Sequence, residues 1–220
     1  MPRLLFEKKG NAVWISHLDL MRVFQRSFKR AGLSLTHTQG FNPRPSVSIA
    51  LPLSVGVESC CEILDFDLEG EPVPYEEIQA RLNEALIAGV RVLQVYDNGA
   101  KLKNLAYLHC NVILEYDQSV PNGTLTAIRA LFASETVIVP KKTKTNGIQD
   151  QNIIPMIRSL DVRQAGEKEL ILDSVVCCQN PTLNPMQLYL AIERYLPECK
   201  ADFVRCCRLE IFDLNSEVFR

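Results

Sequence analysis

The sequence lacks any apolar run of about 20 residues, the length that a membrane-spanning helix needs. Its first residues, MPRLLFEKKG, also lack the apolar core of a signal peptide. Aromatic residues are few, at 7% of the chain, while the hydrophobic content of 47% and the charged content of 23% are ordinary for globular proteins. We therefore expect a cytoplasmic protein without a membrane segment, whose 220 residues form one large or two small domains.

Metal-ligand spacing is also missing, although the chain contains eight cysteines. There is no C-x-x-C, and six of the eight stand in adjacent pairs at 60–61, 177–178 and 206–207. Neighbouring residues of a strand point to opposite faces, so an adjacent pair cannot readily direct both sulfurs at one metal. The sequence predicts reduced thiols, partly buried as small hydrophobes, with no metal site and no bound cofactor.

A helix is predicted over residues 17–31. Ser16 and Asp19 form a capping-box pattern at its start, and Gly32 supplies the left-handed residue that commonly ends a helix. Apolar residues at three- and four-residue steps predict one buried stripe, made of Leu18, Met21, Phe24, Phe28 and Ala31. Basic residues repeat with the same spacing on another face, namely Arg22, Arg26, Lys29 and Arg30.

Positive charge is concentrated at the start of the chain. Residues 1–46 contain eight Lys or Arg and two acids, a net of +6, whereas residues 47–99 contain two Arg and ten acids, a net of −8. The overall charge of −2 hides this separation. Arginine predominates on the helix, and its planar group suits bidentate contacts with phosphate. The pattern favours an anionic ligand such as RNA or a phosphorylated small molecule, and it is equally typical of a solvated helix face.

A second candidate element is the loop GFNPRP at residues 40–45. Its two prolines restrict their own backbone angles and those of the residues before them, so we expect a stiff loop. A rigid loop suits a binding site, although a purely structural loop has the same composition. The residues that we expect to bind a ligand are Arg22, Arg26, Arg30, Gln39, Phe41, Asn42 and Arg44.

An acid–base site is the alternative interpretation of the same region. His17 lies at the predicted helix N-terminus, where the positive end of the dipole disfavours the protonated imidazole. Together with Asp19 and Thr38 it gives three candidate catalytic residues beside the loop. Taken alone, His17 is better explained as a half-buried histidine bonded to the backbone, and no further acid–base partner stands at a recognisable spacing.

The stretch from residue 16 to 62 resembles an uncharacterised bacterial family, the radical-SAM-linked proteins, which are encoded beside or fused to a radical S-adenosylmethionine (SAM) protein. The resemblance implies a radical SAM partner protein and no established activity. The family pattern has Tyr-Ser where this chain has His37 and Thr38, so His37 is not assigned a family role. The matching residues are SHLD at 16–19, Arg22, Arg26, residues 30–32, GFNP at 40–43, Pro45, Pro52, Leu53, Gly56, Ser59 and Glu62.

The order of the expected elements predicts an α+β fold with two tandem ferredoxin-like (βαββαβ) halves, at residues 1–99 and 100–220, the first with an enlarged hairpin. In the first half we expect strands at 3–9, 12–15, 33–37, 47–53, 60–68 and 90–96, and helices at 17–31 and 74–88. In the second half we expect strands at 105–116, 136–139, 153–162, 170–178 and 203–214, and helices at 120–134 and 184–196. The basic segment 141–147 suits either an extension of a binding surface or a solvated loop.

Two functions of different classes follow. The first is a non-catalytic accessory module that binds RNA or another phosphate-bearing substrate and works with a radical SAM partner protein. The second is an enzyme of the nuclease or transferase type, with its acid–base site at His17 and Asp19 beside the GFNPRP loop. The chain lacks the C-x-x-x-C-x-x-C spacing of a radical SAM cluster, so we do not expect it to be the radical SAM enzyme itself.

Overall fold

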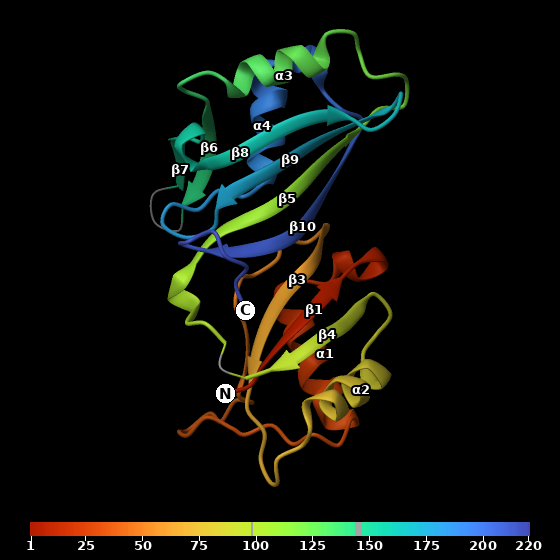
Figure 1. Ribbon diagram of the computed structural model, residues 1–220, viewed down its shortest axis with the longest axis vertical. Coiled ribbons are helices and arrows are strands. Elements are labelled where there is room, and N and C mark those ends of the chain that lie inside the picture. The colour runs from red at the N-terminus through yellow and green to blue at the C-terminus, as the bar shows by residue number, and fades with distance from the viewer. Residues whose placement is uncertain (98, 144–146) are drawn as a thin grey trace. The chain divides into compact units, whose positions relative to one another are not determined.

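The computed structural model describes residues 1–97, 99–143 and 147–220, and the chain divides into two compact units (Figure 1). Unit 1 comprises Met1–Asn104 together with Phe219–Arg220, and unit 2 comprises Leu105–Val218. The sequence placed the division after residue 99. The structure assigns the connector to unit 1, where the N–H of Ala100 donates to the carbonyl of Arg220 at 2.6 Å.

Unit 1 has an antiparallel sheet with helices packed against it. Its elements are β1 (Arg3–Lys8), α1 (His17–Arg30), β2 (Val47–Ile49), β3 (Val57–Phe66), α2 (Tyr75–Ala85) and β4 (Val90–Tyr96). The strands follow the order β4-β1-β3 (Figure 1), and β2 also pairs with β3. One hydrophobic core joins the helices to the sheet, because residues of both helices and of all these strands belong to it.

Unit 2 repeats the same order of elements with an added hairpin. Its elements are β5 (Leu105–Glu115), α3 (Thr124–Phe132), β6 (Ile138–Thr143), β7 (Gly147–Asn152), β8 (Ile157–Gln164), β9 (Glu169–Cys177), α4 (Met186–Tyr195) and β10 (Phe203–Asp213). The antiparallel order is β10-β5-β9-β8, while β6 and β7 form a separate two-stranded sheet. Residues 141–143 of the basic segment lie in β6 and residue 147 begins β7, whereas residues 144–146 lie outside the described part of the chain.

The α+β class is confirmed. Unit 1 has the element order β-α-β-β-α-β that the sequence predicts, whereas unit 2 has four strands, β6 to β9, between its two helices. The finer expectation, that these are two tandem ferredoxin-like halves, stays a prediction.

Helix α1 is held by aromatic packing on its buried face. Phe24 meets Phe6 edge-to-face at 4.7 Å between ring centroids, and Phe28 lies 5.1 Å from the ring of Phe66. Each fully buried phenylalanine contributes roughly 1.5–3 kcal/mol by leaving water. The prediction for Leu18 was wrong, since 68% of it is exposed. Each three-residue step advances only about 300° around a helix, so a stripe extended by such steps drifts off the buried face.

Two predicted strands are absent from the described residues of unit 1. The expected strand at 12–15 is occupied by a 3₁₀ helix, Gly10–Trp14. The buried Lys8 accounts for this turn, because its Nζ donates to the carbonyls of Val13 (3.2 Å) and Ile15 (2.9 Å). The expected strand at 33–37 is reduced to single bridges, from Leu35 to Leu68 and from His37 to Pro45. Pro45 has no N–H, so it cannot extend a ladder of hydrogen bonds.

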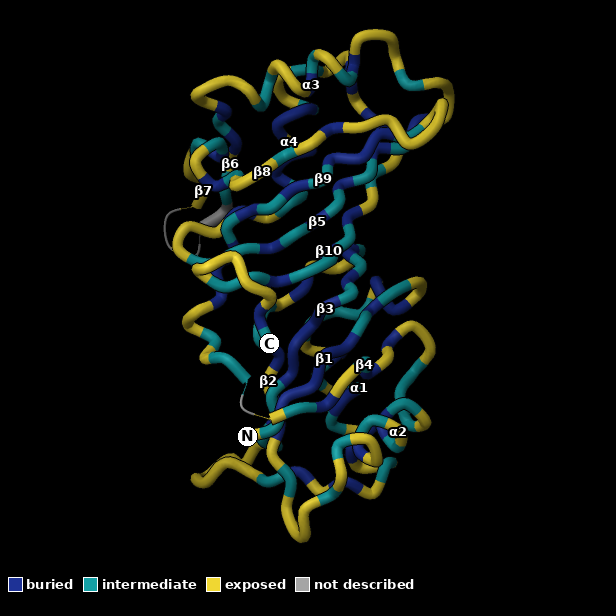
Figure 2. The backbone as a smooth tube through the Cα atoms, viewed as in Figure 1, coloured by how far each residue is buried: buried dark blue, intermediate teal, exposed yellow. Residues whose placement is uncertain are grey.

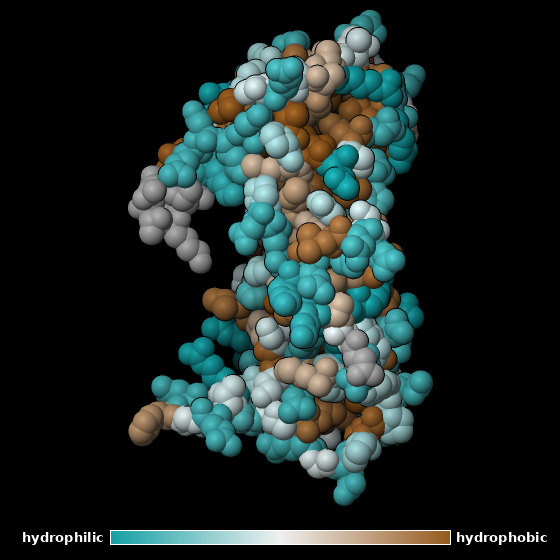
Figure 3. Space-filling view, turned by 60° about the vertical axis from the view of Figure 1, so that its left-hand side comes forward, coloured by the Kyte–Doolittle hydropathy of each residue, from teal (hydrophilic) through white to brown (hydrophobic). Residues whose placement is uncertain are grey.

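The surface is largely polar on the face that Figure 3 shows, where hydrophobic residues occur in separate groups between hydrophilic ones. Among the described residues, none of the helices has both the length and the apolar character needed to cross a bilayer.

Candidate functional site

The SHLD sequence forms the cap of α1. The N–H of Asp19 donates to the Oγ of Ser16 at 3.2 Å, and the Ser16 hydroxyl donates back to the Asp19 carboxylate at 2.7 Å. Arg22 donates to the same carboxylate at 2.7 Å. The hydrogen bond from Ser16 and then that from Arg22 lower the pKa of Asp19. Asp19 is therefore an ionised capping residue and a weak base.

His17 is half-buried, and its Nδ1 is buried without a hydrogen-bond partner. Within the described chain, no hydrogen bond or ion pair joins it to Asp19 or to the loop at 38–44. The candidate catalytic residues therefore do not form a hydrogen-bonded set: Asp19 is engaged in the cap, and Thr38 is engaged in the loop, as described next.

The GFNPRP loop is closed by a pair of hydrogen bonds between its ends. The N–H of Thr38 donates to the carbonyl of Arg44 at 2.9 Å, and the N–H of Arg44 donates to the Thr38 hydroxyl at 3.0 Å. All of residues 37–44 are exposed (Figure 2), and Phe41 is as exposed as in an extended chain, at 107%. The loop thus presents Phe41 and Arg44 to solvent from a closed base, and the Gln39 and Asn42 side chains are likewise exposed.

Most of the N-terminal positive charge is engaged inside unit 1. Arg30 is one example, since its Nη2 donates to the carbonyl of Ala85 and to the hydroxyl of Ser27 (3.1 Å). Ala85 ends α2, so Arg30 joins the two helices and neutralises exposed carbonyls at a helix C-terminus. The other engaged cations are Arg3 with Asp65, Lys8 with backbone carbonyls, Lys9 with Glu7, and Arg22 with Asp19.

Three basic residues keep their charge available: Arg26, Lys29 and Arg44. Each is exposed, and none makes an ion pair or a side-chain hydrogen bond within the described chain. Arg26 and Lys29 are three residues apart and therefore neighbours on the exposed face of α1. Arg44 stands on the loop. We refer to these three residues as the unpaired cations.

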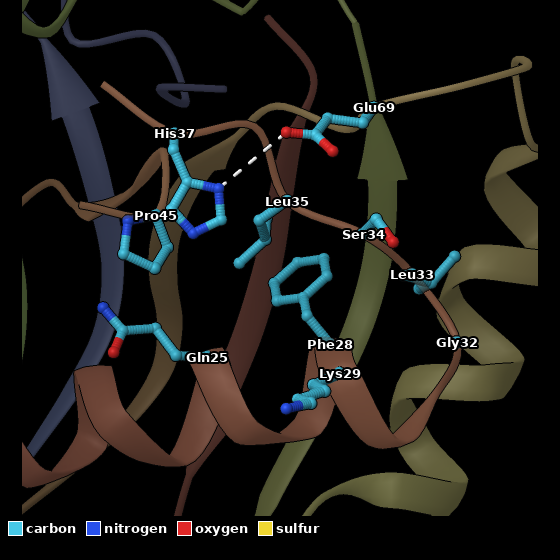
Figure 4. Close-up of a pocket in the computed structure, with 10 residues that line it drawn as sticks. All are labelled: Gln25, Phe28, Lys29, Gly32, Leu33, Ser34, Leu35, His37, Pro45 and Glu69. Atoms are coloured by element: carbon cyan, nitrogen blue, oxygen red, sulfur yellow. Dashed lines mark ion pairs between the residues drawn. The ribbon is translucent and has the colours of Figure 1, made fainter. Parts of the chain in front are cut away.

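A groove of about 410 Å³ lies between α1 and the segment that leads into the loop (Figure 4). Its apolar walls include Phe28, Leu33, Leu35 and Pro45. Its polar border consists of Gln25, Lys29, Ser34, His37 and Glu69. In Figure 4 the imidazole of His37 faces Glu69, with 3.8 Å between Nδ1 and the carboxylate, and the Gln25 side chain extends from α1 on the side of Pro45. Lys29 belongs both to the groove and to the unpaired cations.

Gln25 and Glu69 were not among the site residues predicted from the sequence. Gln25 lies four residues before Lys29, so the helical spacing of the basic face already placed it there. Glu69 had no local signal, because it reaches the groove through the bridge between Leu35 and Leu68, two residues that lie far apart along the chain.

Comparison with protein families identifies the class of protein. The chain belongs to the family described as "uncharacterized protein conserved in bacteria (DUF2344)", whose model matches residues 2–185. A comparison with curated proteins finds no match.

Among solved structures, the chain is similar to a chain of a Cbf5–Nop10–Gar1 complex, with 9% identity and a TM-score of 0.50. The similarity covers 96% of this chain and 48% of that one, so this chain spans about half the length of its structural relative. A second structure, an unknown protein from Galdieria sulphuraria, has 12% identity, a TM-score of 0.27 and 97% coverage of both chains. At these identities the first similarity supports the fold alone, and the second carries no argument.

Proposed function

We propose that this protein is a non-catalytic accessory module that binds RNA, or another phosphate-bearing substrate, and works with a radical SAM partner protein. The observation that carries the proposal is the set of unpaired cations, Arg26, Lys29 and Arg44, which are exposed on α1 and on the adjoining loop. Cations that are free of protein partners can release counterions from a nucleic-acid backbone, which favours binding and makes it dependent on salt.

The loop adds a second feature that suits RNA. Phe41 is fully exposed only three residues from Arg44, and an aromatic ring beside a cation suits a stacked base next to its phosphate. The hydrogen bonds between Thr38 and Arg44 close the base of the loop, which reduces the ordering entropy that binding must overcome.

The alternative, a nuclease or transferase, has less support. A general base works best with a pKa near the working pH, whereas the pKa of Asp19 is lowered by Ser16 and Arg22. The hydroxyl of Thr38 already accepts a hydrogen bond from Arg44. These residues suit structural roles, and we therefore prefer binding to catalysis.

The radical SAM partner is inferred from the family resemblance of residues 16–62. We also propose a cytoplasmic location. Reduced thiols are typical of cytoplasmic proteins, and all eight cysteines of the chain are free. Co-expression of the tagged protein with the radical SAM protein encoded beside it, followed by affinity purification, tests the partnership. Recovery of the tagged protein alone at low and moderate salt would count against it.

The experiment for RNA binding is a filter-binding titration of total cellular RNA at two salt concentrations. The variant Arg26→Glu/Lys29→Glu reverses two unpaired cations. The matched control is Lys101→Glu/Lys103→Glu, which makes the same charge change at exposed positions of unit 1 outside the groove. We expect salt-sensitive binding by the wild type and the control, and its loss in the α1 variant. No binding by the wild type, or equal loss in both variants, would contradict the proposal.

A further inference from the structure

Strand β8 is the outer edge of the unit 2 sheet, because the strand order β10-β5-β9-β8 ends with it (Figure 1). The N–H of Ala165 donates to the carbonyl of Glu169 at 2.9 Å, which marks a hydrogen-bonded pair where β8 turns into β9. Bonded and non-bonded pairs alternate along an antiparallel ladder, and the register is regular from residue 159 to 164. Leu160 and Val162 stand an odd number of positions from Ala165, so they direct their N–H and C=O groups away from β9.

Most of these outward groups are unused. The carbonyl of Val162 accepts from Arg129 of α3, which agrees with its outward direction. Among the described residues, the N–H groups of Leu160 and Val162 and the carbonyl of Leu160 have no hydrogen-bond partner. The outer edge of β4 in unit 1 differs, since the Asn83 side chain exchanges two hydrogen bonds with the backbone of Val92. Of these two edges, that of β8 remains open to a further strand.

A second groove of about 410 Å³, here called the edge groove, lies between β8 and the end of α3. Six consecutive residues of β8, 157–162, line it. Alternate residues of a strand point to opposite faces, so a groove lined by all of them follows the edge of the strand rather than one face of the sheet. Phe132, Ala133 and Ile154 contribute apolar side chains beside this edge. An exposed sheet edge with side-chain pockets beside it is what the addition of a peptide strand requires.

We propose that the edge groove binds an extended segment of the radical SAM partner protein, which adds to the unit 2 sheet as a further strand next to β8. This inference rests on the partnership in the proposed function. An extended polypeptide offers donors and acceptors in alternation, as the edge at Leu160 requires, whereas an RNA backbone offers mainly acceptor oxygens. Two arginines and one aspartate line the groove, Arg129, Arg158 and Asp161, a net charge of +1. The segment should therefore carry an acidic residue beside its apolar ones.

A second copy of this chain is a poorer occupant of the same edge. A symmetric pairing of two β8 edges would bring Arg129 of both copies to one interface, because this side chain is bound at the Val162 carbonyl. Like charges that face each other across paired strands are destabilising. The edge thus suits a single strand from a different protein.

The test is affinity purification of the tagged full-length protein after co-expression with the radical SAM protein encoded beside it. Leu160→Pro removes an outward N–H and keeps the hydrogen bonds to β9, since Leu160 makes none with that strand. Gln164→Pro is the matched control, because Gln164 also points away from β9 but lies outside the edge groove. We expect the partner to bind about tenfold more weakly to Leu160→Pro, the effect of losing one backbone hydrogen bond, and equally well to the control.

Two further measurements give a decision even where the proline variant does not fold. Arg158→Glu reverses an exposed charge in the edge groove, and Arg163→Glu makes the same change at an exposed position of β8 outside it. We expect weaker recovery of the partner with Arg158→Glu alone. In the complex, hydrogen exchange of the Leu160 amide should slow about tenfold. The Asp161 amide, which faces β9 in the free protein, should be unchanged.

The outcomes separate this inference from the proposed function. Equal recovery of the partner with the groove variants and their controls, or an unchanged Leu160 amide in the complex, would overturn the added strand and leave the partnership in place. No recovery with the wild type would overturn both. RNA binding that is lost in Arg158→Glu, or a partner-free dimer that is lost in Leu160→Pro, would assign the edge to another occupant and likewise contradict the inference.

Discussion

Asp19 shows how one residue of the SHLD sequence is explained by local structure. Its backbone N–H and its carboxylate are both bonded to Ser16, and the carboxylate also accepts from Arg22. These bonds stabilise the charged carboxylate, which suits the positive end of the helix dipole. The hydroxyl and the acid of the motif thus cap the start of α1, the helix that carries Arg26 and Lys29.

We predict that the Asp19 carboxylate stays ionised at a pH at which an ordinary aspartate is half protonated. Its pKa in the folded protein is lowered, first by Ser16 and then by Arg22. Its stabilising contribution is therefore present above the usual pKa of 3.8 and is lost as the pH falls through the lower folded-state value. NMR titration of the Asp19 carboxyl carbon measures this pKa, and Arg22→Ala should raise it. A wild-type midpoint at or above 3.8 would contradict the assignment.

Lys8 is a second residue with a defined structural role, since it is only 1% exposed and binds the carbonyls of Val13 and Ile15. Burial lowers its pKa, and the charge of the buried Glu62 raises it. We predict that Lys8→Met destabilises the protein by about 3–5 kcal/mol, because Glu62 stays buried and loses this opposite charge. Urea unfolding measures the loss. Lys9→Met removes a half-buried cation that pairs with Glu7 near the surface, and it should cost less than about 1 kcal/mol. Equal losses in the two variants would contradict the role assigned to Lys8.

At the scale of elements, the GFNPRP loop depends on one side chain for its closed base. We predict that Thr38→Val leaves the global free energy of unfolding within about 1 kcal/mol, because it removes one exposed hydrogen bond. The amide of Arg44 should exchange with solvent faster, since it loses the Thr38 hydroxyl as its acceptor. Hydrogen-exchange NMR measures the change. Thr36→Val, which removes the bond from Thr36 to Asp67, serves as control and should leave the Arg44 amide unchanged.

Helix α1 shows which elements the sequence could predict. Its start at Ser16 and its end before Gly32 depend on residues within a few positions, and the structure confirms both. The sequence predicted less well which residues of the helix face the core. Leu18 was expected on the buried stripe but does not belong to the hydrophobic core. The turn at Gly10–Trp14 was missed for a similar reason: it depends on where the side chain of Lys8 ends, which follows from tertiary packing.

At the scale of the whole molecule, the charge pattern illustrates the limit of sequence reasoning. The excess of positive charge in residues 1–46 predicted a basic surface, yet several of these cations are engaged by distant partners. Arg3 binds Asp65, and Arg30 binds the carbonyl of Ala85. Partners 55 or more positions away cannot be assigned from spacing. The structure therefore reduces the candidate surface to the unpaired cations and adds the groove, whose border is completed by Glu69.

The central claim is that Arg26, Lys29 and Arg44 contact RNA phosphates, and its most direct test is the dependence of the affinity for single-stranded RNA on salt. For single strands, each phosphate contact contributes about 0.7 to the slope of log affinity against log salt concentration. We predict that Arg26→Ala/Lys29→Ala lowers the magnitude of this slope by about 1.4, whereas Lys101→Ala/Lys103→Ala leaves it unchanged. A slope that is the same in all three proteins would contradict the account.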